Sequence, residues 1–433
     1  MYYSDYTISQ GGIHLHTTFI HQRIKVFILC LLTLFLLSIA APHSYADSSI
    51  PFANESYESI VDASGEGDYV SLQQAIDAQA LHIFVRNGVY NVAMTLQIDQ
   101  DGTTIRGQSR EGVIIRQNQA PLDLLVIRAD HVHISNLTLD TYTNNAGAAL
   151  VVADANEVMI QDSLFQGSKT IFAVYFAGPS VKAGEDTLAA VESGTLDQGN
   201  QFLRNEVYSH YAGDGLSFSL QKNGLVQDNI LHHAVLAFYM CRNSEVSTNI
   251  INDSPGVGIH YSMPAYDNII RDNQIYRSLG SGIRASANLE HPVPTTTLYT
   301  GLLIDHNLIK DTRSFGIELD QVGSGTRIQR NNISQTDFSG MIVLRSSDLR
   351  IHNNQLSHNA YYRIRGRLHD WTGNSGGIDL ENTVTATKMT YNTITSNGKS
   401  DFGIRFSPTQ GKNTMYKNKL VGTTLITDII RLP

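Results

Sequence analysis

The feature that most constrains the fold is a repeat that begins near residue 200. The pattern asparagine, any residue, aliphatic residue recurs at successive spacings of 24, 20, 24, 34, 24, 23, 38 and 26 residues. It occurs at Asn205, Asn229, Asn249, Asn273, Asn307, Asn331, Asn354, Asn392 and Asn418. A period in the low twenties, carried by short strands, is typical of a β-solenoid in which each coil stacks on the next.

A second pattern, glycine followed by an aliphatic residue, comes about nine residues after most of these asparagines. Examples are "GLSFSL" at Gly215, "GIHYS" at Gly258, "GIRAS" at Gly282, "GIELD" at Gly316, "GIDLE" at Gly377 and "GIRFS" at Gly403. The alternation in these segments predicts strands with every second side chain facing inward. We interpret the asparagines as structural, because stacked amides at a turn can hydrogen-bond along the axis and tolerate left-handed backbone.

These patterns resemble the right-handed parallel β-helix family, which includes pectate lyases, polygalacturonases, alginate lyases and mannuronan epimerases. The resemblance covers most of residues 80–425 and implies an all-β fold, a right-handed parallel β-helix or β-solenoid. The segment "GDYVSLQQAIDA" (67–78) predicts a short N-terminal capping helix with Ser71 at its start. We expect residues 47–433 to form one such domain.

The N-terminal region predicts export. Residues 21–46 contain two basic residues, a 16-residue apolar run and a small-residue cleavage site, as a secretory signal peptide does. The run is short for a membrane-spanning helix, so we expect cleavage after Ala46, no stable membrane anchor, and a periplasmic or extracellular location. Residues 1–20 are interpreted as an over-long gene start. Outside the signal, Cys241 is the only cysteine, so no intrachain disulfide is expected.

Composition limits the possible partners. The net charge of −9 gives no general attraction for nucleic acid, so an anionic ligand would need a local basic patch. The sequence has no phosphate-binding loop, no dinucleotide-binding glycine pattern and no Gly-x-Ser-x-Gly motif. We therefore expect neither nucleotide nor serine-hydrolase chemistry. We also expect the protein to be a monomer.

A column of outward-facing residues is the candidate site. If Ile259 faces inward, the inward set also contains Leu216, Phe238, Ile283, Ile317, Ile378 and Ile404. The next residue of each strand then faces outward, which gives the column Ser217, Tyr239, His260, Arg284, Glu318, Asp379 and Arg405. Strands of adjacent coils lie about 4.8 Å apart, so His260 would have Tyr239 and Arg284 as direct neighbours. A solvated surface histidine is the alternative, but such clusters mark functional sites.

Two long insertions flank this column, "NLEHPVPTTTLYT" and "AYYRIRGRLHDWTGNS". The second contains the candidate substrate-binding residues Tyr361, Arg363, Arg365, Arg367 and Trp371. Aromatic rings stack on sugar faces, and arginine binds carboxylates through two parallel hydrogen bonds. The insertion therefore predicts the basic patch that an acidic polysaccharide requires, with a decorated surface loop as the alternative.

The preferred chemistry is abstraction of the proton next to a uronate carboxylate, by a polysaccharide lyase or a C-5 epimerase. This reaction needs a cation for the carboxylate, together with a base and an acid. Arg284 is the candidate cation, and His260 and Tyr239 are the candidate proton carriers.

One segment, "SHYAGDGLS", is similar in part to the mannuronan epimerase motif, in which tyrosine is followed three residues later by aspartate, then proline and histidine. Tyr211 and Asp214 match this spacing, whereas Gly215 and Leu216 occupy the proline and histidine positions. The resemblance implies a catalytic role for Tyr211 and Asp214.

Two alternatives remain open. Glu318 and Asp379 lie on the same column with one coil between them, roughly 9–10 Å apart, near the separation of inverting glycoside hydrolases. The polygalacturonase motifs are absent, and Asp320 and Glu381 are expected to pair with arginines across the sheet. The other alternative is a non-catalytic polysaccharide-binding or surface protein.

No cofactor is required by these chemistries, although a divalent cation is possible. His210, His232 and His233 occur near successive turns, but no fixed ligand spacing identifies a metal site. Copper-associated periplasmic β-helix proteins share this coil repeat, which keeps a metal role open.

Overall fold

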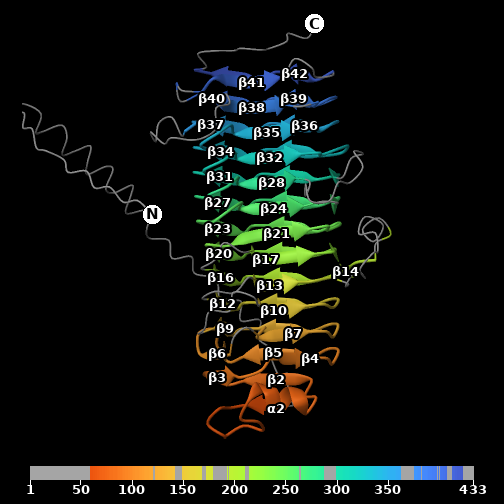
Figure 1. Cartoon of the computed structure of the whole chain (residues 1–433), viewed down its shortest axis with the longest axis vertical. Helices are drawn as coiled ribbons and strands as arrows, with labels where there is room; N and C mark the ends of the chain where they lie inside the picture. The colour runs from red at the N-terminus through yellow and green to blue at the C-terminus, as the bar shows by residue number, and fades with distance from the viewer. Residues whose placement is uncertain are drawn as a thin grey trace, which may run out of the picture. The chain divides into compact units, whose positions relative to one another are not determined.

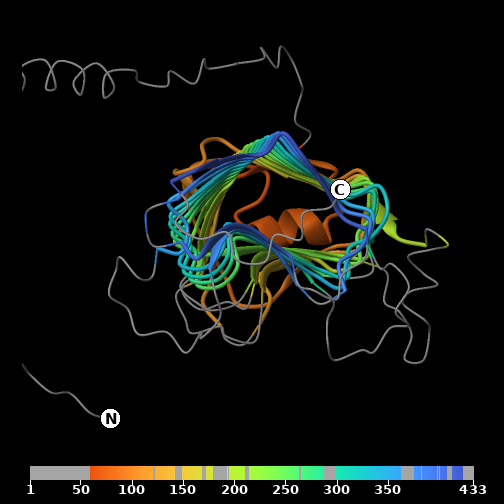
Figure 2. The same ribbon diagram turned by 90° about the horizontal axis from the view of Figure 1, so that it is seen from above.

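The computed structural model describes residues 59–119, 122–141, 149–167, 172–178, 193, 195–209, 214–262, 265–286, 299–361, 375–381, 383–396, 398, 400–406 and 412–422. These residues wind into a stack of coils, and most coils contribute one strand to each of three parallel sheets (Figure 1). Seen along the axis, the three sheets enclose the core (Figure 2). The predicted all-β parallel solenoid is confirmed.

Along each coil the chain passes through sheet 1, sheet 2 and sheet 3 in turn. The described strands of sheet 1 are β1 (Ser59–Val61), β2 (His82–Val85), β5 (Thr104–Gly107), β8 (His133–Ser135), β11 (Met159–Gln161), β15 (Gln201–Leu203), β19 (Leu225–Gln227), β22 (Glu245–Ser247), β26 (Ile269–Arg271), β30 (Leu303–Asp305), β33 (Arg327–Gln329), β36 (Arg350–His352), β39 (Lys388–Thr390) and β42 (Thr414–Tyr416). Those of sheet 2 are β3 (Gly88–Val92), β6 (Val113–Gln117), β9 (Thr138–Thr141), β12 (Leu164–Gly167), β16 (Glu206–Ser209), β20 (Ile230–His232), β23 (Ile250–Asn252), β27 (Gln274–Tyr276), β31 (Leu308–Lys310), β34 (Asn332–Ser334), β37 (Gln355–Ser357), β40 (Thr393–Thr395) and β43 (Lys419–Val421).

Sheet 3 carries the candidate column. Its described strands are β4 (Leu96–Ile98), β7 (Leu125–Ile127), β10 (Ala149–Ala153), β13 (Phe172–Phe176), β17 (Asp214–Ser219), β21 (Val235–Tyr239), β24 (Ile259–Ser262), β28 (Ile283–Ser286), β32 (Ile317–Asp320), β35 (Met341–Leu344), β38 (Gly376–Glu381) and β41 (Phe402–Phe406). Two further short pairs are β14 (Asp197–Gln198) with β18 (Gln221–Lys222), and β25 (Ala265–Tyr266) with β29 (Tyr299–Thr300).

The N-terminal end is covered by the predicted helix, α2 (Leu72–Asp77) (Figure 2). The Ser71 hydroxyl accepts a hydrogen bond from the backbone N–H of Gln74 at 3.3 Å, as expected of an N-cap. Leu72 and Ala75 are buried against the first coil. The helix therefore shields the apolar interior at the start of the stack.

The repeated asparagines form a buried ladder at the turn between sheets 1 and 2. Asn273 shows the pattern: its backbone N–H and its side-chain amide both donate to Oδ1 of Asn307, at 3.0 Å each. The same amide also donates to the backbone carbonyl of Val246 at 3.0 Å. Each side chain thus satisfies buried backbone groups of neighbouring coils, and the structural interpretation of these asparagines is confirmed.

Inward-facing side chains stack in the same way. The rings of Phe176, Phe218, Phe238 and Tyr261 follow one another along the axis, with centroids 4.2, 5.0 and 5.3 Å apart. Aliphatic columns fill the remaining interior. Register between coils is therefore fixed on the inside by packing and at the turn by the ladder.

Candidate functional site

The outer face of sheet 3 presents the predicted column from His260 onward. His260 lies opposite Arg284 on the next strand, and Arg284 lies opposite Glu318. Ile342 comes next, then Asp379 and Arg405. The order predicted for these residues is confirmed, including the one strand between Glu318 and Asp379.

The predicted position of Tyr239 in this column was wrong by two residues. Ala237, not Tyr239, lies opposite His260, whereas Tyr239 lies opposite Ser262. Alternation shows which face a side chain occupies but cannot distinguish residues two apart, and β21 lacks the glycine that marks the other strands. Tyr239 still contacts His260: the two rings meet edge to face, with centroids 5.7 Å apart.

The His260 side chain is half-buried at this contact. Burial, and then the nearby Arg284 cation, lowers the pKa of His260 from 6.5 to about 4. The imidazole is consequently neutral at pH 7 and has a lone pair to accept a proton. A neutral histidine beside a cation is suited to act as a base on an anionic ligand, whose own charge would raise the histidine pKa on binding.

Arg284 is held by Glu318. The Arg284 Nε lies 3.2 Å from Oε1 of Glu318, and the other carboxylate oxygen accepts a hydrogen bond from the Ser281 hydroxyl at 2.7 Å. The Arg284 side chain is 40% exposed, so part of its guanidinium faces solvent. Glu318 thus orients Arg284 and leaves donors for a ligand carboxylate. Sequence reasoning missed Ser281, whose position before Gly282 gave no signal.

The other carboxylates on this face are occupied by arginines. Asp379 is fully buried and accepts two hydrogen bonds from Arg405, at 2.8 and 2.6 Å. Glu381 contacts the same guanidinium. Asp320 pairs with Arg345, as Glu381 does with Arg405, in agreement with the expected cross-sheet pairing. Burial raises the pKa of Asp379 to about 6, and the bonds from Arg405 oppose that rise.

The remaining predicted site residues are spread over several segments. Asp214 begins β17 and lies opposite Val235. Tyr361 is half-buried, and its backbone N–H donates to the Thr336 carbonyl at 2.8 Å. Several predictions fall outside the described residues: the signal peptide at 21–46, the leader at 1–20, and the side chains Tyr211, Arg363, Arg365, Arg367 and Trp371.

The described residues show neither a cluster of metal ligands nor a helix that could span a membrane. They contain no group of three or more histidine, cysteine, aspartate or glutamate side chains arranged to hold a metal ion. His232 instead stacks on Tyr208, with ring centroids 4.4 Å apart. Within the same part of the chain, no helix has the length and apolar character of a membrane-spanning segment.

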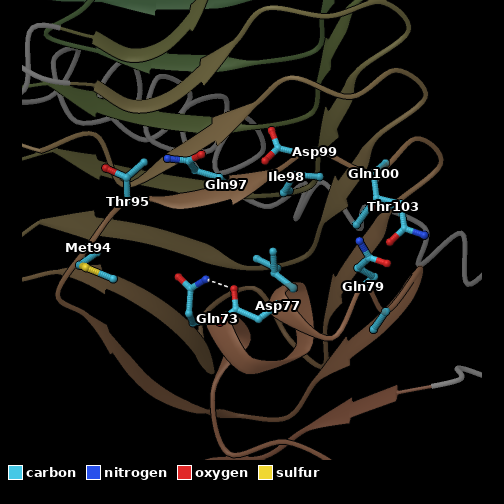
Figure 3. A pocket seen from close by; sticks show the side chains of 12 residues that line it. Gln73, Asp77, Gln79, Met94, Thr95, Gln97, Ile98, Asp99, Gln100 and Thr103 are labelled. Carbon is cyan, nitrogen blue, oxygen red and sulfur yellow. Dashed lines mark hydrogen bonds between the residues drawn. The ribbon is translucent and has the colours of Figure 1, made fainter.

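Two cavities lie away from the column. One, of about 440 Å³, lies between α2 and β4 and is lined by residues that include Gln73, Asp77 and Asp99 (Figure 3). None of the residues that line it is a cation or a histidine. The other, of about 470 Å³, lies on sheet 2 beside Arg110 and Glu206, which pair with each other at 3.5 Å. Neither cavity combines a free cation with a neutral base.

Three solved structures have a similar fold. The A-module of Azotobacter vinelandii mannuronan C-5 epimerase AlgE4 is 18% identical at a TM-score of 0.57, over 81% of this chain and 90% of that chain. The A-module of AlgE6 from the same organism is 17% identical at 0.54, over 82% and 90%. The periplasmic alginate epimerase AlgG is 13% identical at 0.50, over 77% and 78%. At these identities the likeness establishes the fold alone.

A search of curated protein sequences found no match. The family model described as "Right handed beta helix region" matches residues 87–275, 193–321 and 263–420, which together span most of the chain. The matched residues contain the asparagine ladder and the strands of all three sheets from β3 to β42. The chain belongs to the right-handed β-helix family.

Proposed function

We propose that this protein is an exported enzyme that acts on an acidic polysaccharide by proton abstraction, as a polyuronate lyase or C-5 epimerase. The observation that carries the proposal is the neutral, half-buried His260 between the Tyr239 ring and the Arg284 cation. The names of the structural neighbours, mannuronan and alginate epimerases, add support for this substrate class.

Each side chain has a distinct role in the proposed reaction. Arg284 pairs with the uronate carboxylate, so that charge developing there is neutralised. His260 accepts the proton from C-5, and the electron pair left behind is delocalised into that carboxylate. Glu318 is a positioning residue that acts through Arg284.

The fate of the electron pair separates the two reactions. In an epimerase, Tyr239 donates its phenolic proton to the opposite face of C-5, and the phenolate is then reprotonated from solvent. In a lyase, the pair forms a C4–C5 double bond while the bond to the C4 oxygen breaks, and Tyr239 protonates that leaving oxygen. In both reactions His260 then releases its proton to solvent and the Tyr239 phenolate takes one up, so atoms and charge balance without an added redox partner.

The inverting-hydrolase alternative receives less support. Such an enzyme needs two carboxyl groups open to the substrate and to a water molecule. Asp379 is fully buried and bonded twice to Arg405, and Glu318 is engaged by Arg284 and Ser281. A non-catalytic binding protein would not need the neutral histidine beside the cation.

The test is proton NMR of the protein incubated with alginate, polygalacturonate and other polyuronates in deuterated water, with and without a chelator. Unsaturated ends would indicate a lyase, and deuterium at C-5 with inverted sugar signals would indicate an epimerase. New saturated reducing ends would contradict the proposal in favour of hydrolysis. No change in any polymer, from folded protein, would leave a binding protein as the better explanation.

A further inference from the structure

The outer face of sheet 1 carries a ladder of like charges near its C-terminal end. Arg327 lies opposite Arg350 on the next strand, and Arg350 lies opposite Lys388. All three side chains are exposed. None of them forms an ion pair with any residue that the structure describes. Figure 1 labels β36, β39 and β42 one above another in this region.

This arrangement does not stabilise the free protein. Like charges directly opposite each other on paired strands are destabilising, and strands here are about 4.8 Å apart. Several arginines elsewhere on the solenoid do have an acidic partner: Arg204 pairs with Asp162, and Arg277 pairs with Asp253. Three unpaired cations in successive register are an exception in a chain whose net charge is −9. They create a local positive field that an anionic polymer would neutralise.

Exposed aromatic rings lie beside the charges. Tyr391 and Tyr416 are 46% and 54% exposed, and their rings meet edge to face with centroids 6.0 Å apart. The Lys417 ammonium lies over both rings, 4.9 Å from the Tyr416 centroid and 5.7 Å from that of Tyr391. Tyr416 lies at the end of β42, two residues after Thr414, which is opposite Lys388. The rings therefore extend the ladder by one strand.

We propose that this basic–aromatic patch is a second binding surface for an acidic polysaccharide, separate from the column on sheet 3. The patch consists of Arg327, Arg350, Lys388, Tyr391, Tyr416 and Lys417. The polymer runs along the solenoid axis, its carboxylates meet successive cations, and its sugar faces stack on the tyrosines. The choice of a polysaccharide over other polyanions rests on the proposed function.

The patch has a different task from the column. It lies on another sheet from His260 and Arg284, and its neighbouring histidine, His352, is hydrogen-bonded to the Thr390 hydroxyl at 2.8 Å, so the patch holds the polymer without changing it. Holding a long chain on sheet 1 raises the local concentration of substrate at sheet 3. The patch should therefore affect long polymers more than short oligomers.

The experiment measures polyuronate binding by isothermal titration calorimetry, with the full chain in a His260→Ala background to suppress turnover. The variant is Arg327→Gln/Arg350→Gln/Lys388→Gln. The matched control is Arg128→Gln/Lys310→Gln/Arg313→Gln, three exposed cations elsewhere with the same charge change. We expect the ladder variant to bind at least about tenfold more weakly and the control to bind as the parent does. Binding to the parent should also weaken as salt is raised.

Unfolding temperatures show whether the ladder variant binds weakly only because its fold is damaged. Because neutralisation removes like-charge repulsion, the ladder variant should melt at the same temperature as the parent or higher. Equal affinity in parent and ladder variant, or equal losses in ladder and control variants, would overturn the proposal. So would a preference for DNA or anionic lipid vesicles over polyuronate. If the wild type does not turn over polyuronate but the parent binds it and the ladder variant binds it more weakly, the proposed function is contradicted and the patch is still supported.

Discussion

Arg405 and Asp379 face each other on adjacent strands of sheet 3, and the guanidinium donates to both oxygens of a carboxylate with no exposed surface. A buried charge with one cationic partner depends heavily on that partner. We therefore assign Arg405 and Asp379 to the stability of the solenoid and not to ligand binding.

Removing the partner of the buried carboxylate should destabilise the fold. Arg405→Ala is expected to lower the free energy of unfolding by about 3–5 kcal/mol, because Asp379 would be left buried without a counterion. Arg345→Ala is the matched control: Arg345 is 43% exposed and its loss should cost about 1 kcal/mol or less. Urea unfolding monitored by circular dichroism measures both, and equal losses would contradict this assignment.

Stability should depend on pH through Asp379. Burial raises its pKa from the ordinary 3.8 to about 6, so the folded state binds more protons than the unfolded chain between these values. Its contribution is fully present below about pH 4 and is lost as pH rises through about 6. Against Asp379→Asn, the unfolding free energy of the wild type should fall by roughly 3 kcal/mol across this window. A flat difference between the two proteins would show that the carboxyl is not buried as described.

The asparagine ladder should be sensitive to truncation. Asn307→Ala removes the acceptor for two donors of Asn273 and leaves buried backbone groups unsatisfied. We expect a loss of about 2–5 kcal/mol in unfolding free energy. Asn332→Ala, at an exposed position on sheet 2, should change it by no more than about 0.5 kcal/mol. Thermal unfolding of the two variants side by side gives the comparison.

Replacing the cation beside His260 should raise the histidine pKa. In Arg284→Met the Coulombic part of the depression is removed, while the larger contribution from burial remains. The His260 pKa should therefore move upward from about 4 without reaching 6.5. An NMR titration of the imidazole measures this shift, with Arg345→Met as a control that should leave it unchanged. A pKa unaffected by Arg284→Met would mean that the two side chains are not electrostatically coupled.

Polyuronate turnover should require the histidine. We expect His260→Ala to lower kcat by about 10²–10⁴-fold with unchanged folding, as removal of a general base does. Glu318→Gln should have a smaller effect and raise KM, because it loosens Arg284 rather than touching the substrate. If Asp379→Asn instead abolished activity in a folded protein, the hydrolase alternative would be favoured.

Much of the architecture could be predicted because it is periodic. The asparagine spacing gave the coils, and the glycine–aliphatic pairs gave the register of His260, Arg284 and Glu318. Tyr239 was misplaced because no glycine marks its strand and inward side chains two residues apart look alike. Tyr239 nevertheless contacts His260, because a tyrosine side chain is long enough to reach a diagonal neighbour on the next strand.

The basic ladder could not have been found in this way. Arg327, Arg350 and Lys388 are separated by unequal numbers of residues, and only pairing between coils brings them together. The same holds for Ser281 and Glu318, whose hydrogen bond joins different coils. Periodicity predicts where strands lie, but the chemistry of a face depends on the length of every intervening loop.

The asparagine ladder has a consequence for how such a protein can evolve. Because each coil from Asn205 to Asn418 has the same amide-bonded turn, a coil in this part of the stack can be duplicated or lost and the new neighbours will still join correctly. A coil inserted between β24 and β28 would move His260 and Arg284 apart by one strand spacing, and loss of the coil that carries Ile342 would place Glu318 opposite Asp379. Whole-coil duplication thus changes the spacing of the side chains on the outer face of sheet 3 without a single substitution among them.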